Sequence, residues 1–90
     1  MDRLDEEWQL HAPSHIHWPD QDFLLILSGS GSLAQGWFRV YDPIGTKLPS
    51  RVAFATGQPD LLALSLDGKQ LCAITTEDDN YWVITHTFPD

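Results

Sequence analysis

Two histidines and one carboxylate lie close together in the first quarter of the chain. His15 and His17 are separated by one residue, and Asp22 follows after four more. On a strand, both imidazoles would project from the same face, because side chains alternate along an extended backbone. Imidazole and carboxylate ligands together suit iron, manganese, nickel or zinc. We expect a protein without a cofactor. The spacing predicts, as the alternative, a site for one divalent transition metal.

The same stretch resembles the first conserved motif of the cupin superfamily. Read through to Gly29, it has the pattern H-x-H-x4-acid-x6-G. Cupins are small β-barrels in which two histidines and a glutamate bind a divalent metal. The resemblance implies a cupin-like barrel with His15, His17 and Asp22 as its metal ligands. The second cupin motif is matched only in part, since Leu48 stands in place of its histidine. The alternative is that both histidines are simply exposed side chains.

The balance of charges favours a protein partner of opposite charge. The chain has a formal net charge of -8, from thirteen Asp and Glu against five Lys and Arg. This balance argues against direct nucleic-acid binding, because phosphate contacts need a basic face. A basic protein, including one that itself binds nucleic acid, would be attracted to such a chain.

The acidic residues gather in two clusters, one near each end of the chain. We expect a partner to contact both clusters, through Glu6, Glu7, Trp8, Glu77, Asp78 and Asp79. A tryptophan is included because an exposed indole beside acids is typical of a binding hot spot. A domain this small buries about two of its four tryptophans well. The alternative is that the clusters only keep the domain soluble.

Residues 60–88 are predicted to form three antiparallel strands joined by two tight turns. Asp67-Gly68 and residues 77–80 supply the turns, since Asp, Asn and Gly tolerate the left-handed backbone of two-residue hairpins. These turns place Leu64 opposite Leu71, and Ala73 opposite Ile84. Paired residues share a face. The face that we expect to be buried consists of Leu62, Leu64, Leu71, Ala73, Trp82, Ile84 and His86.

The sequence also contains a weak internal repeat, which we call the internal echo. Residues 19–28 align with 66–75 at an offset of 47 residues, and 36–40 align with 81–85 at an offset of 45. This period is similar to the blades of WD-repeat-like β-propellers. The resemblance implies a fragment of a ring or an oligomeric β module, because a ring needs at least about four blades. The alternative is that any meander of hairpins produces such an echo.

The remaining segments complete a mainly β fold. Residues 23–27 predict a central strand that is buried on both faces, and residues 36–41 and 50–56 predict two more strands. A short helix is expected over residues 2–11, ending at Pro13. We therefore expect a single domain, 1–90, built as a small antiparallel meander of about six strands, barrel- or sandwich-like. Residues 1–13 form its N-terminal arm or short helix.

Enzymatic signatures are missing from the sequence. It has no Ser-His-Asp order with a nucleophile elbow, no glycine-rich phosphate loop and no CxxC pair. Its only cysteine, Cys72, fits a small buried hydrophobe in a reducing, cytoplasmic compartment. No apolar run is long enough to cross a membrane.

These observations predict a small acidic, non-enzymatic interaction module, an inhibitor that occupies a basic site on a partner protein. In size and charge it resembles anti-CRISPR and toxin-immunity proteins. The alternatives are a cupin-like metal-binding barrel, and a propeller-blade fragment or homo-oligomeric β module.

Overall fold

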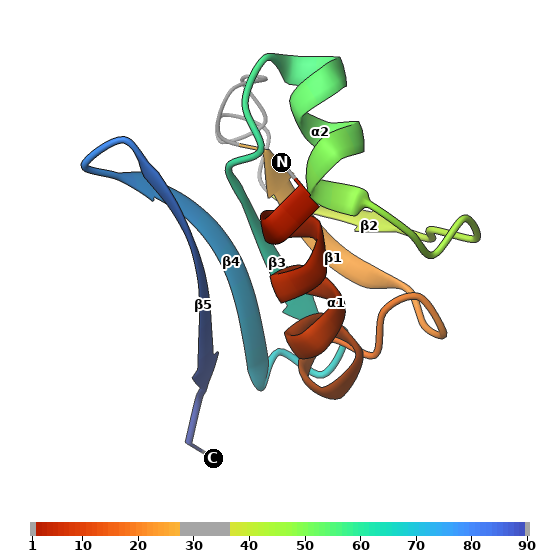
Figure 1. Cartoon of the computed structure of the whole chain (residues 1–90). Coiled ribbons are helices and arrows are strands. Elements are labelled where there is room, and N and C mark those ends of the chain that lie inside the picture. The colour runs from red at the N-terminus through yellow and green to blue at the C-terminus, as the bar shows by residue number, and fades with distance from the viewer. Residues whose placement is uncertain (1, 28–36, 90) are drawn as a thin grey trace.

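The computed structural model describes residues 2–27 and 37–89, which fold into one antiparallel sheet and two helices (Figure 1). In chain order the elements are α1 (Asp2–His15), β1 (Phe23–Leu27), β2 (Phe38–Val40), α2 (Leu48–Thr56), β3 (Leu61–Ser65), β4 (Gln70–Glu77) and β5 (Asn80–Thr87). The strand order is β2-β1-β3-β4-β5. The predicted mainly β fold with a short N-terminal helix is confirmed. Within the described ranges the sheet is open, with five strands, rather than a barrel or a sandwich.

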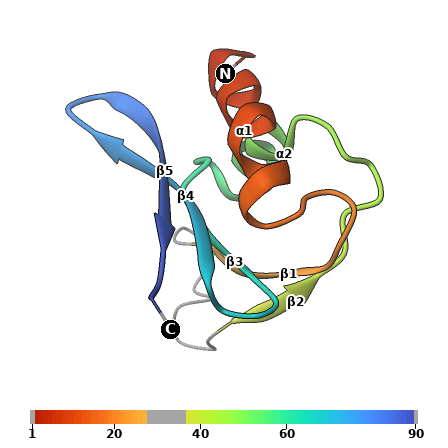
Figure 2. The same ribbon diagram turned by 90° about the horizontal axis from the view of Figure 1, so that it is seen from below.

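The hydrophobic core lies between the helices and the concave face of the curved sheet (Figure 2). α1 contributes Leu4, Trp8 and Ala12, which recur every four residues and therefore share one side of the helix. Trp18, in the turn after the helix, meets the Trp8 ring edge-on, with ring centroids 6.2 Å apart. The sheet and α2 contribute Phe23, Leu25, Leu61, Ala63, Cys72, Ile74, Leu48 and Val52.

The predicted register of the last three strands is confirmed. Leu64 is opposite Leu71, and Ala73 is opposite Ile84. The second turn has Asp78 and Asp79 at φ angles of 50° and 64°, as a two-residue turn with a left-handed backbone requires. In the first turn only Gly68 has a positive φ, and its N–H donates to the Ser65 carbonyl at 2.9 Å. The first turn therefore differs in type from the prediction but keeps its register.

The prediction of which face is buried was wrong. Ala63, Cys72 and Ile74, on the opposite face, are at most 1% exposed, whereas Trp82 is 53% exposed and Ile84 is 43% exposed. Only Ala73 of the expected set is buried; Leu62, Leu64 and Leu71 are half-buried, and His86 is exposed. Both faces are apolar, so their alternation could not choose between them. The face with small side chains, Ala63 and Cys72, is the one that shares the core with Trp8.

Residues 50–56 were expected to form a strand, but they lie in the second helix. Val52 is buried and Phe54 is 96% exposed. In a strand Val52 and Phe54 would share one face, whereas in a helix they lie about 200° apart and therefore on opposite sides. The local signal for a helix is Pro49 in its first turn, where a missing N–H costs no hydrogen bond.

α1 also runs further than the sequence predicted. Pro13 lies inside the helix, which ends at His15, and the Ile16 N–H still donates to the Ala12 carbonyl at 2.9 Å. Burial of Ala12 and Ile16 in the core holds this last turn in place. His15, which was expected to lie on an extended strand, is therefore part of the helix.

The internal echo corresponds to two hairpins, β1 with β2 and β4 with β5, on either side of β3. These hairpins share one sheet and do not form separate blades. Residues 28 and 36 of the echo, and Gly29 of the cupin-like motif, lie outside the described residues.

Candidate protein-interaction site

The structure does not bring the cupin-like residues together. His15 is in the last turn of α1, with its Nδ1 2.9 Å from the His11 carbonyl oxygen. His17 is exposed in the following turn, and Asp22 accepts a 2.8 Å hydrogen bond from Arg39 Nε. Within residues 2–27 and 37–89, no group of three or more His, Cys, Asp and Glu could hold a metal ion. The reason is the helix, which replaces the strand that the H-x-H geometry needs.

The N-terminal acidic cluster divides into a structural part and an exposed part. Asp5 is buried and accepts the Ser50 N–H at 3.0 Å and the Ser50 hydroxyl at 2.5 Å. It therefore caps α2, whose own N-cap residue, Lys47, makes no capping bond with its side chain. Glu6 is exposed, whereas Trp8 is fully buried in the core and is not available to a partner.

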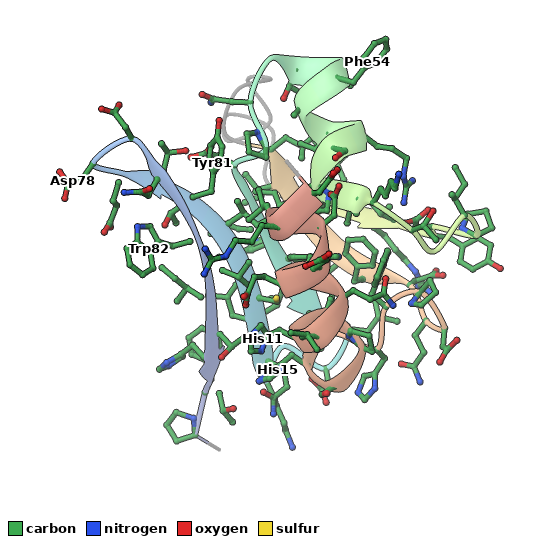
Figure 3. The ribbon with its side chains drawn as sticks, viewed as in Figure 1. His11, His15, Phe54, Asp78, Tyr81 and Trp82 are labelled. Carbon is green, nitrogen blue, oxygen red and sulfur yellow. The ribbon has the colours of Figure 1, made fainter. Side chains whose placement is uncertain are left out.

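The C-terminal acidic cluster lies at the tip of the β4–β5 hairpin, which projects beyond the helices (Figures 1 and 3). Glu77, Asp78 and Asp79 are all exposed. In the part of the chain that the structure describes, no basic side chain lies within salt-bridge distance of these three carboxylates. Their negative charge is therefore not neutralised by a neighbour in the fold.

Large apolar side chains follow directly after this acidic tip. Tyr81 is 47% exposed and Trp82 is 53% exposed, and they lie on opposite sides of β5 (Figure 3). Ile84 is on the same face as Trp82. Exposed aromatic side chains beside a charged rim are the composition of a binding hot spot rather than of an ordinary surface.

A groove of about 560 Å³ lies between α1 and this hairpin. Its walls come from the first two turns of the helix and from the start of β5. They consist of Arg3, Leu4, Glu7, Asn80, Tyr81, Trp82 and Val83. Glu7 lies 3.7 Å from the His11 imidazole, so its charge is partly compensated when that ring is protonated. The groove thus has Glu7 of the N-terminal cluster in one wall, and its opposite wall begins at Asn80, directly after the acidic tip.

A second hollow, of about 670 Å³, lies between the start of α1 and the segment that leads into α2. It is lined by Asp2, Asp5, Glu6, Gln9, Leu10, Thr46 and Lys47. Asp5 is already committed to capping α2, and the remaining walls are polar or charged side chains and Leu10. This hollow has no aromatic residue to anchor a partner.

The buried carboxylate of Asp42 is part of the fold. Burial alone would raise its pKa, but hydrogen bonds from Arg51 and Trp18, together with the Arg51 charge, outweigh that effect and lower the pKa. Trp18 Nε1 donates to Oδ2 at 2.7 Å, and Arg51 donates to both carboxylate oxygens. All its partners are side chains and turn amides of this chain, so Asp42 is a structural anchor.

Cys72 has no features of a nucleophile. It is a free, fully buried thiol, and burial raises its pKa to about 12. The thiolate that would react is therefore scarce at neutral pH.

Among the described residues, no helix is long and apolar enough to span a membrane.

Sequence reasoning placed the acidic tip but missed its apolar neighbours, since Trp82 and Ile84 were assigned to the interior. One signal could have found them: β5 carries bulky residues on both faces, and when few helices pack on a sheet, only one of its faces is covered.

Comparison of the chain with protein-family models, with curated proteins and with solved structures found no match.

Proposed function

We propose that this chain is a small non-enzymatic interaction module that binds a basic partner protein through its β4–β5 hairpin. One observation carries the proposal. Tyr81, Trp82 and Ile84 are all more than two-fifths exposed, directly beside three carboxylates that have no ion-pair partner among the described residues. A folded chain on its own gains nothing from exposing these apolar side chains on the two faces of one hairpin.

The two parts of this surface have different tasks. The carboxylates at the tip attract the basic partner and raise the rate of association, an effect that salt screens. The aromatic side chains supply affinity once they are covered, because burying a tryptophan at an interface is often worth about 2 kcal/mol or more. Specificity then depends on whether the partner offers both a cationic rim and an apolar recess.

The proposal includes an inhibitory action. A partner whose basic site normally binds nucleic acid would be blocked when Glu77, Asp78 and Asp79 occupy that site. The free thiol of Cys72 fits a reducing compartment, and we place the protein in the cytoplasm as part of the same proposal.

The test begins with an affinity pull-down and continues with binding kinetics of the captured protein at increasing salt. We expect Asp78→Asn/Asp79→Asn to slow association about three- to tenfold at low salt and to flatten the salt dependence. Asparagine is chosen because it tolerates the left-handed backbone of both positions.

Asp2→Asn/Asp20→Asn is the matched control, since it removes the same charge from two exposed residues outside the hairpin. It should change association by less than about twofold. Equal effects of the two double variants would contradict a role for the hairpin, and binding that is insensitive to salt would contradict the electrostatic part.

A further inference from the structure

We infer that the outer edge of β5 accepts an extended segment of the basic partner as a sixth strand of the sheet. The inference rests on the proposed function and names how the partner binds. In β-strand addition, main-chain hydrogen bonds supply affinity and alternate side chains supply specificity.

The hydrogen-bonding pattern shows which backbone groups of β5 are free to pair. The Phe88 N–H donates to the Lys69 carbonyl at 2.7 Å, so the backbone groups of Phe88 face β4. Hydrogen-bonded and non-bonded pairs alternate along an antiparallel ladder. The N–H and C=O groups of even-numbered β5 residues therefore point toward β4. Those of Tyr81, Val83, Thr85 and Thr87 point toward the outer edge.

β5 itself, which the structure describes in full, lacks four features that normally prevent strand pairing. β5 is eight residues long, is last in the strand order and contains no Asp, Glu, Lys, Arg or Pro. Proteins usually protect an edge with a short strand, a charge, a proline or a bulge. The register with β4 is continuous from Gln70 opposite Thr87 to Glu77 opposite Asn80, so no bulge interrupts it.

The surroundings of the edge would receive both rows of side chains of an added strand. One row would lie over the groove that Leu4, Tyr81 and Val83 line beside α1. The other row would lie beside Trp82 and Ile84 on the face that carries no helix (Figure 2). Both rows would meet apolar surface, which favours β-branched or aromatic residues in the added strand.

The negative charge beside the β5 edge favours a basic segment as the added strand. Glu77, Asp78 and Asp79 lie at one end of the edge, and Glu7 lies in the groove, whose described walls also include Arg3. A strand with lysine or arginine at that end would compensate the carboxylates. A second copy pairing through its own β5 would bring no Lys or Arg to them, since β5 has neither. The edge therefore fits a basic extended segment better than it fits a second copy.

The probe for this inference is a nine-residue peptide with blocked ends, which has lysines only at the end that meets the acidic tip and valines and threonines in the remainder. We expect it to quench or shift the tryptophan fluorescence of the protein on binding and to slow amide hydrogen exchange at Tyr81, Val83, Thr85 and Thr87. The same peptide with N-methyl groups on alternate residues keeps its charge but loses its donors, so it should bind at least about tenfold more weakly.

Two substitutions at one position test the edge from the side of the protein. Thr85→Pro removes an outward N–H without touching the ladder to β4, and edge positions tolerate proline. It should weaken peptide binding at least about tenfold, whereas Thr85→Val, which keeps the N–H, should change it by less than about twofold. If circular dichroism shows that Thr85→Pro does not fold, the inference is tested by comparing the binding of the plain and the N-methylated peptide to the wild-type protein.

Three outcomes would overturn the inference. They are equal binding of both peptides, absence of exchange protection at all four outward amides, and protection that rises with protein concentration when no peptide is present. The last would identify a second copy as the occupant. If these failures occur while a captured partner still responds to salt and to Asp78→Asn/Asp79→Asn, the proposed function stands and strand addition alone is wrong.

Discussion

The two edges of the sheet differ in length and in charge. β2 has three residues, and its central residue, Arg39, pairs with Asp22 at 2.8 Å. β5 has eight residues and no charged side chain other than a titratable histidine. Short strands and edge charges discourage further pairing. The β2 edge of the sheet is therefore protected against further pairing, whereas the β5 edge is able to receive a strand.

The same two sides of the sheet also differ in how firmly they are attached. Directly after β2, Asp42 holds the turn to Trp18 and to Arg51 of α2 through side-chain hydrogen bonds. β5 pairs with β4, and most of its side chains remain exposed. Substitutions on the β2 side should therefore change stability, and substitutions on the β5 side should change binding.

The largest expected effect is on the anchored side. Asp42→Ala removes the acceptor of a buried indole N–H and of a guanidinium that is one-third exposed, and should lower the free energy of unfolding by about 3 kcal/mol. Urea denaturation at neutral pH measures it. Asp22→Ala, which removes a carboxylate that is 30% exposed and pairs with a mostly exposed arginine, is the control and should cost less than about 1 kcal/mol. Equal losses would contradict a special role for Asp42.

The pH dependence of stability follows from the lowered pKa of Asp42. The group is more acidic in the fold than its ordinary value of 3.8, so the folded state binds fewer protons than the unfolded state in this range. Its contribution is complete above that value and is lost as pH falls through the folded pKa. The stability difference between the wild type and Asp42→Ala should therefore shrink in acid, as urea titrations below about pH 4 would show. A difference that is constant with pH would contradict the assignment.

Two exposed tryptophans allow the next comparison. Trp82 on β5 is 53% exposed, and Trp37 beside β2 is 42% exposed. Trp82→Ala should weaken partner binding by about 2 kcal/mol, roughly thirtyfold, because it removes a central aromatic anchor. Trp37→Ala should weaken it less than about threefold. Calorimetric titration of the captured partner measures both, and the reverse order would move the interface to the β2 side.

The smallest effect is expected at the protected edge itself. Arg39→Ala breaks an ion pair whose arginine side chain is 67% exposed, so solvent screening limits the loss of stability to about 0.5 kcal/mol. Urea denaturation measures the loss. A cost above about 1 kcal/mol would mean that Arg39 supports the fold rather than only guarding the edge.

The parts of the fold that could be predicted are those with local causes. Residues 77–80 contain the short polar side chains that a left-handed turn requires, and the strand pairing on either side follows from them. Residues 50–56 were missed because the alternation of Val52 and Phe54 with smaller or polar residues is typical of a strand, whereas packing of the helix buries Val52 and leaves Phe54 exposed. The histidines of the H-x-H motif were misplaced for a related reason, since the helix continues through Pro13 as far as His15.

The sequence by itself determined the pairing of β3, β4 and β5 and the position of the acidic tip, because turn residues and backbone hydrogen bonds act between near neighbours in the chain. Only the tertiary structure decided which side of these strands is covered. Both sides offer apolar residues, and α1 with Trp8 occupies the side where Ala63 and Cys72 leave room. That docking is what leaves Trp82 and Ile84 at the surface.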